Sequence, residues 1–110
     1  MPIGLTGLDG KVALVTGAGR MRSIGRSIAV TLARAGCDVV LTGTGRAPGR
    51  YPADERAAGW RDIDSVAEEI RALGRRALPL VSDIADPAAV EALFGRVIRE
   101  FGQDLFHRDL

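Results

Sequence analysis

A glycine-bearing turn over residues 16–25 carries the residue types that bind phosphate groups. It contains Gly17, Gly19 and Gly25, and the hydroxyl of Ser23 adds a hydrogen-bond donor. Backbone N–H groups at the start of a helix attract anions, and a glycine lets a phosphate approach the backbone because no Cβ atom stands in the way. The turn is therefore predicted to hold the pyrophosphate of a dinucleotide.

The glycine spacing departs from the strict dinucleotide-binding string GxGxxG, because five residues separate Gly19 from Gly25. Two other nucleotide sites fit less well. A P-loop ends on a lysine followed by Ser or Thr, whereas Gly25 is followed by Arg26. A methyltransferase-like site needs a carboxylate for the ribose hydroxyls, and residues 41–45 contain none. A turn that binds no ligand is the remaining alternative.

The segments on either side of the turn place it between a strand and a helix. Residues 11–16 are a short, mostly apolar run, typical of a strand that is buried on both faces. Apolar residues recur at helical spacing from Ser23 to Ala35, and Gly36 ends this helix. Residues 38–42 are again apolar and β-branched, which indicates a second strand. The turn thus has the strand–turn–helix context that dinucleotide binding requires.

A long connection follows the second strand. Residues 43–61 are rich in glycine, proline and arginine and show neither a helical nor an alternating pattern, so they are predicted to form a surface loop. Loops of this length inside a compact domain are usually functional. Residues 63–73 are predicted to form a helix, capped by Asp62 or by Ser65, which fits a capping box with Glu68.

The last two elements complete a regular alternation. Residues 77–82 indicate a third strand, in which the proline suits the first part better than the centre. Asp86 caps the last helix, Pro87 occupies its first turn, and Gly102 follows its end. The order βαβαβα predicts an α/β fold, a partial Rossmann unit with three layers and a parallel sheet. Residues 1–110 are predicted to be the amino-terminal, dinucleotide-binding half of such a domain.

The composition and net charge of the chain exclude several classes of binding partner. A chain of 110 residues with 46% hydrophobic and 26% charged residues is expected to fold as one domain. A net charge of +1 argues against nucleic acid and anionic membranes as partners. The start of the chain has neither a basic leader nor a long apolar stretch, so a cytoplasmic location is expected. Cys37 is the only cysteine, which excludes an intrachain disulfide and a thiolate metal cluster.

The opening stretch LDGKVALVTG over residues 8–17 resembles the first strand and glycine motif of the short-chain dehydrogenase/reductase family, and the likeness continues to about residue 102. The glycine loop is longer than is usual in that family and has Ser23 in place of the middle glycine, similar to the variant loop of the enoyl-ACP reductase branch. The resemblance implies an NAD(P)-dependent oxidoreductase. It places in the cofactor-binding turn Gly17, Gly19, Arg20, Ser23, Ile24 and Gly25.

The choice between the two cofactors is expected to depend on the residues after the second strand. An acid there binds the ribose hydroxyls and repels a 2′-phosphate, and residues 39–52 contain no acid. Arg46 follows the strand and Arg20 lies in the glycine turn, where either guanidinium can pair with a phosphate. NADP(H) is therefore favoured over NAD(H). The alternative for Arg46 is a solvated cation of the loop.

The segment after the third strand also resembles a cofactor contact of the family. Ser82, Asp83 and Ile84 match the place where an aspartate meets the adenine amino group and the next apolar residue packs against the ring. The carboxyl end of a strand faces the binding crevice in this fold. Asp83 is equally well explained as the cap of a local turn.

The catalytic residues of the family do not occur in this sequence. The family's chemistry uses a tyrosine and a lysine four residues later, assisted by a serine and an asparagine. Tyr51 is the only tyrosine and is followed at the lysine position by Glu55, and the chain has no asparagine. His107 is a lone histidine near the end of the chain and is not expected to be a general base.

The sequence is therefore expected to be the amino-terminal portion of a longer reductase, able at most to bind the cofactor. The helices that form the family's homo-oligomers are not in it, and a parallel sheet in the order 3-2-1 leaves the first strand at an edge, where non-native self-association is expected. The alternative is a non-catalytic nucleotide-binding, regulatory or interaction module of this length.

Overall fold

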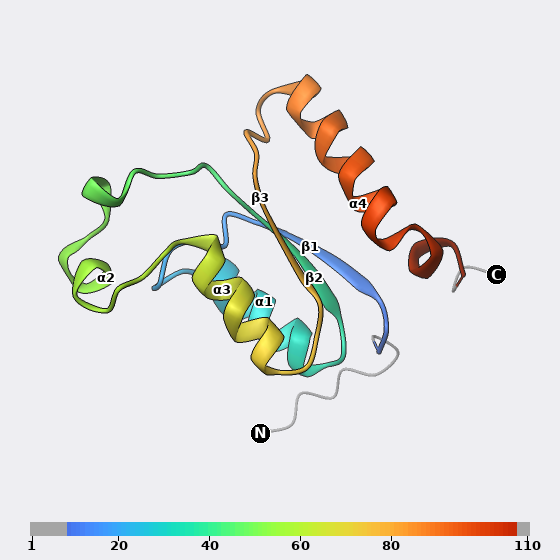
Figure 1. Cartoon of the computed structure of the whole chain (residues 1–110), viewed down its shortest axis with the longest axis horizontal. Coiled ribbons are helices and arrows are strands. Elements are labelled where there is room, and N and C mark those ends of the chain that lie inside the picture. The colour runs from blue at the N-terminus through green and yellow to red at the C-terminus, as the bar shows by residue number, and fades with distance from the viewer. Residues whose placement is uncertain (1–8, 108–110) are drawn as a thin grey trace.

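A computed structural model describes residues 9–107 of the chain, with residues 48 and 103–107 described by their backbone alone. Its centre is a parallel sheet in the order β1-β2-β3. The strands are β1 (Val12–Thr16), β2 (Asp38–Gly43) and β3 (Ala77–Val81). Helices α1 (Ile24–Arg34) and α3 (Ile63–Ala72) cover one face, and α4 (Pro87–His107) covers the other (Figure 1). The predicted α/β class and partial Rossmann unit are confirmed.

The buried strand β2 explains how the layers hold together. All its residues are buried, because alternate side chains face opposite helical layers. Val39 and Leu41 pack with α1 and α3, whereas Val40 packs with α4. In register, Val12 pairs with Asp38, so the carboxyl ends of β1 and β2 reach the same edge of the sheet. This edge is where the glycine turn begins.

The ends of two helices are set by the side chains that the sequence indicated. The hydroxyl of Ser23 accepts a hydrogen bond from the N–H of Arg26 at 3.1 Å and caps α1. The carboxylate of Asp86 accepts from the N–H of Ala88 at 3.0 Å at the start of α4. Gly36 has φ +103°, which suits a glycine after the end of α1.

The predicted caps of α3 are confirmed only in part. Asp62 occupies the N-cap position but makes no side-chain cap bond. Ser65 lies inside the helix, where its hydroxyl accepts a hydrogen bond from the N–H of Arg61 at 2.8 Å. Glu68 forms an ion pair with the side chain of Arg61. No capping box forms, because the side chains of Ser65 and Glu68 both interact with Arg61 instead.

The segment over residues 43–61 is not the irregular loop that was predicted. It contains a 3₁₀ turn, Pro48–Arg50, and a short helix, α2 (Ala53–Ala57). The sequence of α2 is ADERA, which favours a helix and has acids in its first turn. Its one buried residue is Glu55, so it lacks the apolar stripe by which amphipathic helices are recognised.

The predicted end of the last helix is also wrong. Helix α4 passes through Gly102 and ends at His107. A single glycine costs a helix only about 1 kcal/mol and is tolerated inside a helical pattern. On the amino-terminal side of this glycine, Phe101 is buried against the sheet and anchors α4.

We expect the 110-residue chain to self-associate through β1. In the described sheet β1 pairs only with β2, and Leu14 on it is 40% exposed. The opposite edge strand, β3, is blunted by Pro79, which has no N–H to offer. The substitution Leu14→Lys should shift the chain toward monomer, because a charge on an edge strand opposes pairing. Sedimentation velocity over a concentration series measures this, and a wild-type chain that stays monomeric throughout would contradict the prediction.

Candidate functional site

A cavity of about 260 Å³ lies at the carboxyl ends of β1 and β2. Glycines of the turn and of the strand end form part of its wall, and a threonine and three charged residues form the rest. Its lining residues are Gly17, Gly19, Arg20, Gly43, Thr44, Arg46 and Asp62. The cavity therefore brings together the glycine turn and both arginines that the sequence singled out.

At two positions of the turn, neighbouring atoms lie so close to the backbone that only glycine fits. A Cβ atom at residue 25 would lie 2.7 Å from the carbonyl oxygen of Gly17 and 3.0 Å from the Cα atom of Ala18. A Cβ atom at Gly19 would overlap the carboxylate of Asp62. Gly17 has φ +67°, a left-handed conformation that side chains disfavour. The turn therefore presents bare backbone to the cavity at Gly17 and Gly19.

The start of α1 leaves hydrogen-bond donors next to the turn. The N–H of Arg26 is taken by the Ser23 hydroxyl, and this hydroxyl donates at 2.8 Å to the carbonyl oxygen of Arg20. Within the described residues, the N–H groups of Ile24 and Gly25 make no hydrogen bond. Unbonded N–H groups at the positive end of a helix dipole are groups that attract anions, so the predicted contact of Ile24 and Gly25 with a phosphate has donors available. The Ser23 side chain thus organises the turn.

The lengthened part of the glycine turn is held by the segment that contains α2. The carboxylate of Glu55 accepts a hydrogen bond from the N–H of Met21 at 2.9 Å. The indole N–H of Trp60 donates to the carbonyl oxygen of Gly19 at 2.6 Å. Glu55 is 3% exposed, so the acid is buried between the two segments. The turn and the α2 segment therefore form one structural unit.

Arg26 fixes the same unit from the side of α1. Its guanidinium forms two hydrogen bonds of 2.8 Å with the carboxylate of Glu69 and one of 2.7 Å with the carbonyl oxygen of Met21. It also lies over the ring of Trp60, 4.7 Å from the ring centroid. The extra residues of the turn are thereby tied to α1, α3 and the α2 segment.

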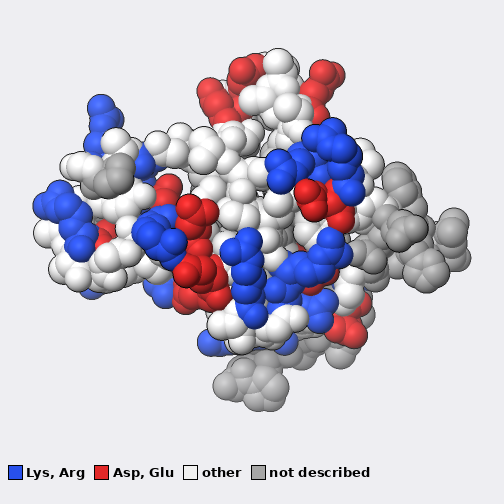
Figure 2. Space-filling model, in the orientation of Figure 1, with Lys and Arg blue, Asp and Glu red and all other residues white. Residues whose placement is uncertain are grey.

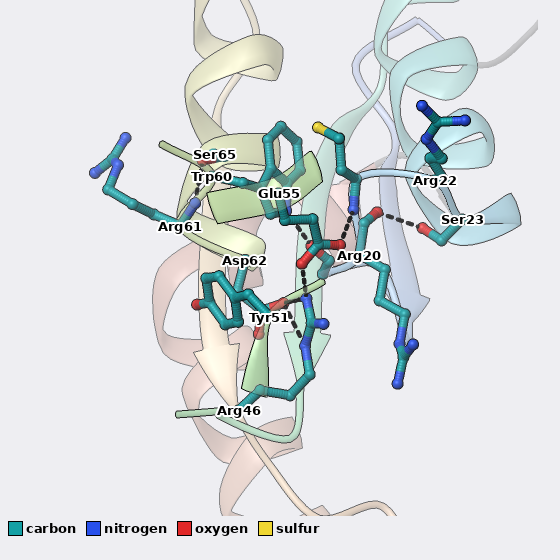
Figure 3. A network of polar contacts seen from close by, with 12 residues as sticks. Arg20, Arg22, Ser23, Arg46, Tyr51, Glu55, Trp60, Arg61, Asp62 and Ser65 are labelled. Atoms are coloured by element: carbon teal, nitrogen blue, oxygen red, sulfur yellow. Dashed lines mark hydrogen bonds and ion pairs between the residues drawn. The ribbon is translucent and has the colours of Figure 1, made fainter. Parts of the chain in front are cut away.

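Arg46 lies in a buried ion network, not in solvent (Figure 3). Its guanidinium contacts Asp62 Oδ1 at 2.6 Å and Glu55 Oε1 at 3.0 Å, and its side chain is 12% exposed. The ring of Tyr51 stacks against it at 4.7 Å. Burial by itself would lower the pKa of Arg46, but the hydrogen bonds and charges of the two acids outweigh it and raise the pKa. The interpretation of Arg46 as a solvated loop cation is wrong.

Asp62 is the residue of this cavity that sequence reasoning missed. An acid that binds the ribose is expected directly after the second strand, and Asp62 lies well beyond that position. Asp62 precedes α3 and reaches the cavity only because the intervening segment folds back. Its φ of 57° is the one positive value outside glycine among residues 9–107. A local sequence signal for such a contact does not exist, although Asp is among the residues that tolerate positive φ.

Asp83 and Ile84 do not line the cavity of the glycine turn. The carboxylate of Asp83 accepts a hydrogen bond from the N–H of Ala85 at 2.9 Å, so it caps a local turn after β3. Ile84 is 57% exposed. Their contact with an adenine ring stays a prediction.

Outside this cavity, the described part of the chain offers no cluster of side chains for a metal ion. Among residues 9–107 no group of three or more His, Cys, Asp or Glu side chains is placed to hold a metal ion. None of the helices in this range is long and apolar enough to cross a membrane. On the face shown in Figure 2, basic and acidic side chains adjoin one another over the middle of the molecule, and a group of acidic side chains lies at the top of the view. The side chain of His107 lies outside the described residues.

The fold and the glycine turn have counterparts in known proteins. The short chain dehydrogenase family matches residues 11–105, nearly the whole chain. This chain belongs to that family. The matched span includes the glycine turn, the α2 segment and Asp62, so the whole candidate site lies within the family's sequence unit.

The relatives are oxidoreductases of greater length. An uncharacterized oxidoreductase of Mycobacterium tuberculosis is 38% identical over 96 residues, which are 87% of this chain and 30% of the relative. Versicolorin reductase 1 of Aspergillus parasiticus is 41% identical over 95 residues, or 86% of this chain and 30% of the relative. This chain therefore spans about 30% of the length of these relatives.

Solved structures show the same arrangement of elements. A short chain dehydrogenase of Mycobacterium thermoresistibile superposes with a TM-score of 0.69 at 32% identity, over 86% of this chain and 31% of the other. NAD⁺-bound xylitol dehydrogenase superposes with a TM-score of 0.67 at 30% identity, over 87% of this chain and 31% of the other. Carveol dehydrogenase of Mycobacterium avium, in complex with NAD, superposes with a TM-score of 0.66 at 27% identity, over 86% of this chain and 32% of the other. Two of these neighbours thus hold a dinucleotide.

Proposed function

We propose that this chain is the cofactor-binding part of an NAD(P)-dependent short-chain oxidoreductase. The observation that carries the proposal is the cavity at the carboxyl ends of β1 and β2, lined by the glycine turn. Ligands of open α/β sheets bind at this edge. The nicotinamide of a bound cofactor accepts or gives the hydride, whereas the residues described here bind and orient the adenosine and phosphate groups.

The chain offers groups that fit a dinucleotide. The N–H groups of Ile24 and Gly25 suit the pyrophosphate, and the open space beside Gly17, which has no side chain, gives it room. The Tyr-x-x-x-Lys pair of the family does not occur in these 110 residues, since Tyr51 is the only tyrosine. We therefore propose that the 110 residues alone bind the cofactor without transferring hydride.

We further propose that the arginines of the cavity favour NADP(H). The Nη1 atom of Arg46 is buried and has no hydrogen-bond partner within the described part of the chain. The side chain of Arg20 is exposed beside the same cavity and makes no ion pair with another described residue. A 2′-phosphate supplies acceptors for both guanidinium groups, and charge-assisted bonds of this kind are the strong ones.

A cofactor titration tests the proposal. We expect NADPH to change the fluorescence of Trp60, because its indole N–H is bonded to Gly19 at the wall of the cavity. Isothermal titration calorimetry should give a stronger affinity for NADPH than for NADH. A chain that melts cooperatively yet binds neither cofactor would overturn the proposed function, and a stronger affinity for NADH would overturn the preference alone.

A further inference from the structure

The two oxygens of the Asp62 carboxylate have different surroundings. Oδ1 accepts hydrogen bonds from Arg46 Nη2 at 2.6 Å and Arg46 Nε at 3.2 Å. Oδ2 makes no hydrogen bond within the described residues, and it lies 3.0 Å from where a Cβ atom of Gly19 would stand and 3.6 Å from that of Gly43. One oxygen therefore anchors an arginine, and the other is an acceptor at the wall of the cavity.

The room for this carboxylate comes from two glycines. Gly19 belongs to the phosphate-binding turn and Gly43 ends β2, so Asp62 Oδ2 lies between the turn and the end of the second strand. A side chain at Gly43 would meet Ile63 at 2.9 Å, next to Asp62. The space beside the end of β2 is thus filled by an acid that enters from the start of α3.

The backbone of Asp62 directs the side chain into the cavity. Its φ of 57° and ψ of −134° lie in a region that residues other than glycine rarely adopt. A side chain with an ordinary N-cap conformation would bond to the first N–H groups of α3. Asp62 makes no such bond, and its side chain is only 10% exposed. An uncommon backbone and an unused cap together hold the carboxylate at the cavity.

We propose that Asp62 determines how strongly this site discriminates between the two cofactors, by accepting a ribose hydroxyl of the adenosine and opposing a 2′-phosphate. The inference rests on the proposed function of the cavity. The site holds two cations, Arg20 and Arg46, and two acids, Glu55 and Asp62. Removing the charge of Asp62 leaves the cations in excess, so a 2′-phosphate should bind more strongly. A ribose hydroxyl loses its charged acceptor and should bind more weakly.

Two nucleotides that differ only in the 2′-phosphate test the inference on the 110-residue chain. Isothermal titration with 5′-AMP and with adenosine 2′,5′-bisphosphate gives the ratio of the two affinities. In Asp62→Asn this ratio should rise about tenfold in favour of the bisphosphate, because the 2′-phosphate no longer meets a like charge at the site. The matched control Asp64→Asn removes an exposed acid two residues away and should leave the ratio unchanged.

A second variant guards against a folding defect. Asp62→Gly suits the positive φ and also removes the carboxylate, so it should raise the ratio in the same direction. An unchanged ratio in folded Asp62 variants, or an equal loss of affinity for both nucleotides, would overturn the inference and leave Asp62 as a support of Arg46. Binding of neither nucleotide by the wild-type chain would instead overturn the proposed function.

Discussion

Replacing Gly25 with alanine is expected to abolish NADPH binding and to lower the free energy of unfolding by about 3 kcal/mol. A Cβ atom there would lie 2.7 Å from the carbonyl oxygen of Gly17 and 3.0 Å from the Cα atom of Ala18. Both are backbone atoms of the turn, so they cannot move without displacing the turn itself. Isothermal titration with NADPH and urea denaturation measure the two effects.

A glycine in a helix far from the turn supplies the control. A Cβ atom at Gly95 would meet only the side chain of Arg99 at 3.6 Å, an ordinary contact. Gly95→Ala should bind NADPH as the wild type does and gain about 0.5–1 kcal/mol of stability, because alanine is the better helix former. Wild-type affinity for NADPH in Gly25→Ala would show that the turn does not form the binding site.

The elements that were predicted correctly are those whose signals are local. Strand β2 is buried on both faces and therefore has a continuous apolar sequence. The start of α1 is set by Ser23, whose side chain bonds three residues along the chain. Dinucleotide binding at the turn stays a prediction, and it also rests on a local signal, because the glycines and the helix start are neighbours in sequence.

The sequence did not predict helix α2, because the residue that α2 buries is charged and not apolar. An amphipathic helix is recognised by its apolar stripe, whereas α2 buries one residue, Glu55. The partners of Glu55 are Arg46 and the N–H of Met21, 34 residues away. Periodicity within a segment contains no information about a contact of this kind.

Asp62 shows the same limit at the site itself. The sequence argument for NADP(H) used the absence of acids between residues 39 and 52, which is correct for that segment. The structure brings Asp62 to the end of β2 from outside it, next to Gly43. We therefore expect the cofactor preference to depend on this tertiary contact as well as on the arginines of the loop.

Replacing Glu55 with alanine is expected to lower the free energy of unfolding by about 3 kcal/mol, since breaking a buried ion pair leaves its partner uncompensated. The carboxylate binds the guanidinium of Arg46 at 3.0 Å through Oε1 and the N–H of Met21 at 2.9 Å through Oε2. Both partners lose an acceptor in the variant, and the lengthened turn loses its attachment to α2. Urea denaturation measures the stability, and the fluorescence of Trp60 reports the turn.

The two roles of Glu55 can be separated by a second variant. In Glu55→Gln the amide oxygen still accepts from Met21, but the charge opposite Arg46 is gone, so the loss of stability should lie between those of Glu55→Ala and the wild type. Glu68→Ala is the matched control: its ion pair with Arg61 is more than half exposed on both sides, and such pairs contribute at most about 1 kcal/mol. Equal stability of Glu55→Ala and Glu68→Ala would show that the buried network does not hold the turn. The predicted order of stability, with Glu55→Gln between the wild type and Glu55→Ala, would show that the charge of Glu55 and its hydrogen bond to Met21 stabilise the turn separately.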